Sequence, residues 1–202
     1  WSVRMKTAQM LRNDLRAIAP LVKALHDENK DVRQAVVQSV INLGSDAVEP
    51  LLELLQDTNA TTPETRKDAI KILNRIRDQR MIPVLVKTLG DPNLSVRKAA
   101  AESIKKVGSP AVDALAKAVA SKDGDVQWRA VEALGDIGDV RAVAALVEGM
   151  NDDDADVRLK AAEVLDSLGW KAVKAEEQIA YAIAKEHWED LPPFGAQAVP
   201  FL

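Results

Sequence analysis

The sequence contains no cysteine, so neither disulfide bonds nor thiolate chemistry can contribute to its fold or function. It has two histidines, His26 and His187, and neither lies in a metal-ligand spacing such as His-Glu-x-x-His. The sequence also lacks a glycine-rich phosphate loop and any grouping that pairs a nucleophile with a base. We therefore expect a non-catalytic protein, not an enzyme, without a cofactor or a bound metal.

Long apolar runs are absent as well. None approaches the roughly 20 residues that a membrane-spanning helix needs, so we expect no membrane span. The lack of cysteine fits a reducing compartment and predicts a cytoplasmic protein. The net charge is −4, whereas nucleic-acid-binding proteins are usually basic. We therefore expect the partner to be another protein.

Aromatic residues make up only 3% of the chain, although 47% of its residues are hydrophobic. The core must therefore consist of Ala, Val, Leu and Ile. Such small side chains allow helix axes to approach one another closely. Glycine and proline, nine of each, recur at intervals and are not gathered in one linker. This distribution indicates a repetitive helical architecture.

One block recurs along the chain. A Val-Arg pair is followed by glycine twelve positions after the valine, as in Val32-Arg33 with Gly44. Degenerate copies replace one or two members of the block; Gln127, for example, stands at the arginine position. The copies begin at residues 3, 32, 65, 96, 126 and 157, a period close to 31 residues. A period that persists through six copies indicates a tandem array.

Each copy predicts an antiparallel hairpin of two helices. Val96, Ala100, Ile104 and Val107 fall on one stripe of a helix that starts at the block, which we call the second helix. Glycine at the next position is the expected C-terminal cap, because it adopts a positive φ without strain. Apolar runs such as residues 50–55 supply the preceding, first helix.

The pattern Asp-x-x-Val-Arg-x-x-Ala-Ala-x-x-Leu-x-x-Ile-Gly, followed by Ala-Val-x-x-Leu, carries a resemblance. It is matched best at Ser95–Leu115, Asp125–Leu146 and Asp156–Gly169. It resembles the short HEAT-like repeat first associated with phycobilisome lyases. The resemblance covers residues 1–169 and implies an all-α fold, an α-solenoid whose hairpins form a right-handed superhelix.

The remaining residues are expected to differ from the array. Residues 170–194 predict a spacer helix with an aromatic cluster of Trp170, Tyr181 and Trp188. Residues 195–202 resemble the start of a further, truncated repeat. Both ends therefore look cut from a longer array, and solenoid ends normally need polar caps. We expect exposed apolar surface there and self-association through these ends.

Positions two, six and nine after the start of each second helix point away from the core stripe. In HEAT arrays the second helices line the concave face, so these positions would form a binding surface. It is basic in the middle of the array and acidic toward its end, where Trp128 and Leu159 stand one repeat apart. The predicted protein-binding residues are Lys67, Lys98, Trp128, Glu132, Leu159 and Glu163.

Several interpretations stay open. Trp128 and Leu159 are either interface anchors or are covered by a loop or by the tail helix. The arginine ladder is either an anion-binding stripe or a structural device that bridges to the neighbouring repeat, and we favour the latter. Its members are Arg4, Arg33, Arg66, Arg97 and Arg158. The expected function is a protein-interaction scaffold; the alternatives are a bilin-lyase-like or chaperone-like subunit and a nucleic-acid-binding helical-repeat protein.

Overall fold

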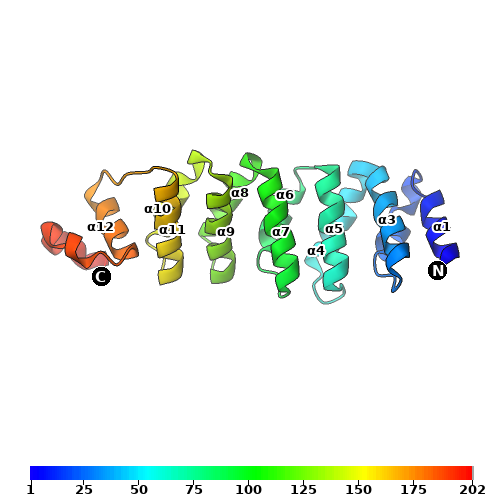
Figure 1. Ribbon diagram of the computed structural model, residues 1–202, viewed down its shortest axis with the longest axis horizontal. Helices are drawn as coiled ribbons and strands as arrows, with labels where there is room; N and C mark the ends of the chain where they lie inside the picture. Colours follow the sequence, from blue (N-terminus) through cyan, green and yellow to red (C-terminus); the bar gives the residue numbers. More distant parts are fainter. Residues whose placement is uncertain (202) are drawn as a thin grey trace. The chain divides into compact units, whose positions relative to one another are not determined.

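The computed structural model describes residues 1–201; within them the chain forms α-helices and short 3₁₀ turns and no strand (Figure 1). The all-α solenoid expected from the sequence is confirmed. The second helices are α1 (Ser2–Met10), α3 (Lys30–Leu43), α5 (Pro63–Ile76), α7 (Leu94–Val107), α9 (Gly124–Ile137) and α11 (Ala155–Ser167). The first helices are α2 (Ile18–Ala24), α4 (Val48–Gln56), α6 (Met81–Thr88), α8 (Val112–Val119) and α10 (Val143–Gly149). α12 (Ala175–Ala184) follows them.

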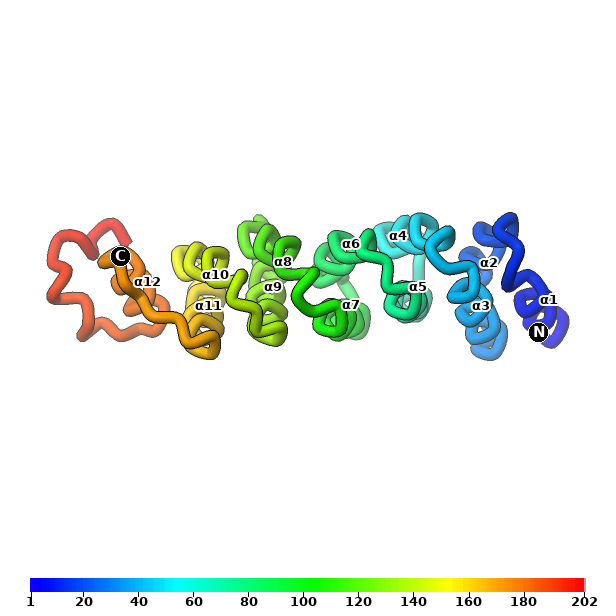
Figure 2. The backbone as a smooth tube through the Cα atoms, turned by 90° about the horizontal axis from the view of Figure 1, so that it is seen from above, coloured from blue at the N-terminus to red at the C-terminus, as the bar shows by residue number. Residues whose placement is uncertain are grey.

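The chain forms two compact units, Trp1–Val107 and Gly108–Leu202. In the first unit α1, α3, α5 and α7 pack side by side in chain order, and α2, α4 and α6 form a second layer (Figure 2). In the second unit α8 packs on α9 and α10, α11 packs on both α9 and α10, and α12 packs on α11. We number the hairpins by their helices: hairpin 2 is α2–α3, hairpin 3 α4–α5, hairpin 4 α6–α7, hairpin 5 α8–α9 and hairpin 6 α10–α11.

The core follows the stripe that the spacing predicts. Ala100 and Ile104 of α7 are completely buried, and so is Leu165 of α11. Several members of the stripe differ from the expectation, among them Val107 at the end of α7, which is only partly buried. Val126 near the start of α9 is only partly buried, and Val3 of α1 is 76% exposed. Helix α1 has no first helix of its own among the described residues to cover it, which accounts for the exposure of Val3.

The second helices α3, α5, α9 and α11 begin at side-chain caps. Asn29, Thr62, Asp123 and Asp154 each accept hydrogen bonds from backbone N–H groups of the first helical turn. These groups have no partner inside the helix, so each cap stabilises its helix by about 1 kcal/mol. At the other end of α5, Arg77 takes the left-handed conformation that Gly138 takes after α9. The degenerate repeat therefore keeps the turn without its glycine.

The tail packs as a small unit of its own on α12. Ile179, Ala182, Leu191 and Ala198 form a buried cluster. Of the expected aromatic cluster, Trp170 and Tyr181 are in contact, with ring centroids 6.4 Å apart. Trp188 is 54% exposed, so its expected place in that cluster is wrong; it lies in a 3₁₀ turn after α12 has ended, Trp188–Asp190.

Residues 192–201 form a kinked 3₁₀ segment. Gly195 has φ 49° and ψ −126°, close to the φ 64° and ψ −139° of Gly44, which precedes the first helix of hairpin 3. The alanine three positions later is buried in both places, Ala198 and Ala47. The likeness to a hairpin start therefore extends from sequence to backbone, and the start of a further repeat at 195–202 stays a prediction. Leu202 lies outside the described residues.

Candidate functional site

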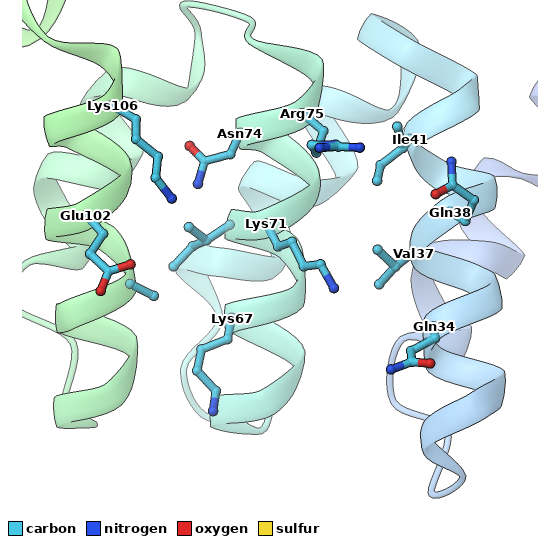
Figure 3. Close-up of a pocket in the computed structure, with 12 residues that line it drawn as sticks. Gln34, Val37, Gln38, Ile41, Lys67, Lys71, Asn74, Arg75, Glu102 and Lys106 are labelled. Atoms are coloured by element: carbon cyan, nitrogen blue, oxygen red, sulfur yellow. The ribbon is translucent and has the colours of Figure 1, made fainter.

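A groove runs along the second helices of the first unit, across α3, α5 and α7 (Figure 3). Its cavity volume is about 560 Å³. Four cationic side chains line it: Lys67, Lys71 and Arg75 from α5 and Lys106 from α7. One carboxylate, Glu102 of α7, lines it as well. We call this the basic groove.

The cations stand at four-residue steps on α5, which places them on one face of the helix. In Figure 3, Lys71 and Arg75 extend from α5 toward α3, whereas Lys106 extends from α7 toward Asn74. Lys67 has a carboxylate neighbour on its own helix, Glu64, whose Oε1 is 3.7 Å from the lysine Nζ. At this distance an exposed pair contributes little binding energy, so Lys67 remains open to an external anion.

Amide side chains and small apolar side chains complete the groove. Gln34, Gln38 and Asn74 supply amide groups, which both donate and accept hydrogen bonds. Asn74 is held in place, because its Oδ1 accepts a hydrogen bond from Ser103 Oγ at 2.5 Å. Val37 and Ile70 are buried beneath. The groove therefore offers charge, hydrogen bonds and an apolar floor together.

One acidic group beside the groove is perturbed. Burial raises the pKa of the Asp68 carboxyl on α5 above its usual value, and the nearby cations Lys71 and Arg33 only partly oppose this effect. Asp68 is partly buried. Its negative charge therefore costs folding free energy at neutral pH.

The second unit carries the predicted apolar patch. Leu159 on α11 is 39% exposed, as the sequence suggested. Trp128 on α9 is partly buried, which lies between the two interpretations left open for it. The guanidinium carbon of Arg129 lies 5.9 Å from its ring centroid, and such a stacked cation removes one ring face from water. Glu132 is partly buried and Glu163 is exposed, with its Oε2 accepting from Lys160 Nζ at 3.2 Å.

The six predicted binding residues are divided between the two units. Lys67 lies in the basic groove, but Lys98 is not among the residues that line it, although it is exposed on α7. Trp128, Glu132, Leu159 and Glu163 belong to the second unit. Lys106 was missed by the sequence reasoning. Lys106 stands ten positions after Val96 and four after Glu102, which occupies the sixth position. Residues four apart are neighbours on a helix surface, so this spacing could have identified Lys106.

The arginine ladder holds the loops inside the hairpins. Arg33 Nη1 donates to the carbonyl oxygens of Asp27 and Glu28, at 2.7 and 3.0 Å. The same pair of bonds recurs from Arg97 to Asp91 and Pro92, and from Arg158 to Asp152 and Asp153. These three arginines therefore fix the loop of their own hairpin, not that of a neighbouring repeat as expected.

Two ladder arginines reach the following hairpin instead. Arg66 forms a two-point ion pair with Asp91, and Arg4 Nε lies 2.8 Å from Asp27 Oδ2. Asp27 and Asp91 each stand five positions before the start of the next copy of the repeated block, at residues 32 and 96. In hairpin 3 that position is Ala60, so Arg33 has no acidic partner at the equivalent position.

Other polar links fall at the same junctions. Between hairpins 3 and 4, Arg80 Nη2 donates to the carbonyl of Ser45, and Ser103 donates to Asn74. Between α1 and hairpin 2, Ser39 Oγ donates to the carbonyl of Ala8. The hydrogen bond between hairpins 2 and 3 is weaker, from Thr65 Oγ1 to the carbonyl of Leu25 at 3.3 Å. The junctions in the first unit therefore alternate between strongly and weakly linked.

The second unit repeats the strong arrangement between hairpins 5 and 6. Gln127, at the arginine position, donates through Nε2 to Asp152 Oδ2 at 2.6 Å. Arg141 Nη2 donates to the carbonyl of Ser109 at 2.8 Å. Hydrogen bonds from the side chain and backbone of Arg141 hold the pKa of Asp139 far below its usual range, so this carboxylate stays charged and keeps Arg141 in place.

The acidic loop before α11 is engaged in its own hydrogen bonds. Asp152 accepts from the backbone N–H of Asp154 and from Gln127, and Asp154 caps α11. Within residues 1–201, no group of three or more His, Cys, Asp or Glu side chains is arranged to hold a metal ion. The described helices also include none that is both long and apolar enough to cross a bilayer.

The comparisons with known proteins agree with the hairpin array. A family model described as HEAT repeats matches residues 1–62, 58–126 and 107–166. A search of curated proteins found no match.

Solved structures share the general fold at low identity. The complex of CpcE and CpcF of phycocyanin lyase from Nostoc sp. PCC7120 matches at 20% identity and a TM-score of 0.45, over 75% of this chain and 99% of that one. A designed armadillo repeat protein in complex with the peptide (KR)4 matches at 19% and 0.39, over 81% and 91%. Human deoxyhypusine hydroxylase matches at 17% and 0.37, over 98% and 88%. TM-scores this low carry no argument about function.

Proposed function

The chain belongs to the HEAT-repeat family, and from this premise we propose that it is a non-catalytic protein-interaction scaffold. The partner binds as an extended segment or a helix along the second helices, and not along the first helices. The basic groove carries the proposal. It is a concave, exposed surface on the second helices that combines an apolar floor with hydrogen-bonding amides and charges.

The second-unit patch is part of the same proposal. Leu159 and the exposed edge of Trp128 supply apolar contact area, and large side chains of this kind dominate binding energies at protein interfaces. Glu132 and Glu163 supply negative charge on the same two helices, α9 and α11. Such a surface suits a partner that carries an apolar residue beside Lys or Arg, with the charges guiding encounter more than adding affinity.

The geometry favours no second function. The bilin-lyase-like and chaperone-like alternatives have no feature of the geometry in their favour. A single-stranded nucleic acid would gain affinity from base-stacking aromatic side chains beside the cations, and the residues that line the basic groove include none.

The proposal is tested by panning a random twelve-residue peptide library on the immobilised chain. The affinity of each enriched peptide is then measured for the parent chain and for variants in each of the two helix layers. Lys67→Glu and Leu159→Ala change the second helices, whereas Glu53→Ala and Lys117→Ala change exposed residues of the first helices. We expect at least one family of peptides to bind tenfold or more weakly to a second-helix variant. We expect no family to bind more weakly to the two first-helix variants. Enrichment of peptides that respond only to the first-helix pair would refute the proposal.

A further inference from the structure

The charge of the basic groove is not balanced by its own lining. Four cations, Lys67, Lys71, Arg75 and Lys106, face one carboxylate, Glu102. The whole chain has a net charge of −4, so this surface is opposite in sign to the molecule that carries it. A local excess of positive charge within a concave, low-dielectric wall attracts anions selectively.

The lining distinguishes between anionic partners. A single-stranded nucleic acid binds through phosphates together with stacking of its bases on aromatic rings. The groove has an aliphatic floor that includes Val37, Ile41 and Ile70, and no aromatic residue lines it. Glu102 would also lie against a continuous run of phosphates. A peptide suits this lining better, because its aliphatic groups can cover the floor and its charges can be spaced to avoid Glu102.

The amides favour a peptide as well. Gln34 and Gln38 come from α3 at one side of the groove, and Asn74 comes from the middle helix α5 with its amide turned toward α7 (Figure 3). Each amide can donate to a peptide carbonyl and accept from a peptide N–H. Because Ser103 already donates to Asn74 Oδ1, the NH₂ group of Asn74 is oriented as a donor.

Resting on the scaffold function proposed above, we propose that the basic groove binds an extended acidic segment of a partner protein. Neighbouring packed helices lie about 8–10 Å apart. A polyproline II segment, an extended conformation with three residues per turn, advances about 3.1 Å per residue, so three residues span that distance and every third side chain points to the same side. Asp or Glu at every third position therefore places one carboxylate at the α5 cations and the next at Lys106 of α7.

The test uses a fluorescein-labelled peptide of four Asp-Ser-Gly triplets and its Asn-Ser-Gly counterpart, measured by fluorescence anisotropy. We expect the acidic peptide to bind and to weaken steadily as sodium chloride rises, since salt screens these charges. Lys71→Glu and Lys106→Glu should each reduce affinity tenfold or more. Lys23→Glu, which reverses an exposed lysine on α2, should leave it unchanged. Melting curves of the variants show that each is folded.

Three results would overturn the inference: equal affinity for the Asn-Ser-Gly peptide, no effect of Lys71→Glu, or tighter binding of a twelve-nucleotide oligothymidine. The peptide library separates this failure from failure of the scaffold function. Neutral or basic enriched peptides that are sensitive to Lys71→Glu would refute the acidic segment and leave the scaffold standing. A library that yields no binder to the second helices would refute both.

Discussion

The guanidinium of Arg66 lies against the carboxylate of Asp91 in the following hairpin, with Nε–Oδ2 at 2.7 Å and Nη2–Oδ1 at 3.0 Å. The two side chains are 3% and 1% exposed. Arg66 Nη1 also donates to the carbonyl of Thr61, and Asp91 Oδ1 accepts from the backbone N–H of Asn93. The pair therefore connects the loops of hairpins 3 and 4 with its buried charges satisfied.

Removing one member of this pair should be costly. Asp91→Ala leaves the buried charge of Arg66 without its counterion, and breaking such a pair typically costs about 3–5 kcal/mol. The control is Glu49→Ala, which removes an exposed partner of Arg80 and should cost less than about 1 kcal/mol. Urea denaturation measures both. Equal losses for the two variants would show that burial of the Arg66–Asp91 pair has no consequence for stability.

Charges placed on the core stripe should be severely destabilising in each unit. Ala100→Asp and Leu165→Asp introduce an unpaired carboxylate at completely buried positions, and we expect a loss of several kcal/mol from each. The matched control is Glu102→Asp on α7, an exposed position. Thermal melts followed by circular dichroism check this. A variant that melts like the parent chain would mean that the side chain does not face the core.

Trp128→Ala separates packing from binding. The indole of Trp128 is partly buried and contacts the guanidinium of Arg129. Replacing it by Ala should therefore lower the free energy of unfolding by about 1–2 kcal/mol, which is less than the loss expected for a fully buried tryptophan. Trp188→Ala, at a more exposed site, should cost less still. If peptides bind the second-unit patch, the first variant should also weaken them by about 2 kcal/mol. A loss of stability above about 3 kcal/mol would identify Trp128 as core and remove it from the binding surface.

The raised pKa of Asp68 makes a pH-dependent prediction. A carboxyl whose pKa is higher in the folded chain than in the unfolded chain favours folding when it is protonated, and this contribution is lost as pH rises through the folded-state pKa. Asp68→Asn removes the charge. It should therefore raise the melting temperature at pH 7 and have a much smaller effect at pH 3, below both pKa values. A larger gain at pH 3 than at pH 7 would contradict the assigned direction of the shift.

The hairpins could be predicted because their signals are local and repeated. The spacing of Val32, Val36 and Val40 identifies one helix face, and all three are buried. Six copies of that spacing reinforce one another, so a single substitution such as Arg77 for glycine did not obscure the pattern.

Polar contacts between hairpins were much harder to predict. Arg66 and Asp91 are 25 residues apart, and nothing near either residue in the sequence indicates its partner. The sequence left two interpretations of Trp128 open because helix periodicity describes the core side of a helix and not what its neighbours place against the other side. The groove depends on which side chains of three helices converge, a property that single-helix periodicity does not contain.

The alternation of strong and weak junctions limits which hairpins of the array can be duplicated or deleted without loss of an ion pair. If hairpin 3 alone were duplicated in tandem, Arg66 of the first copy would face Ala60 of the second, and a buried guanidinium would lose its carboxylate. Duplicating hairpins 3 and 4 together keeps Asp91 opposite every Arg66. Val32 and Val96 are 64 positions apart, and Val96 and Val157 are 61 apart. A viable duplication that includes hairpin 3 should therefore carry hairpin 4 with it, in a step of that size.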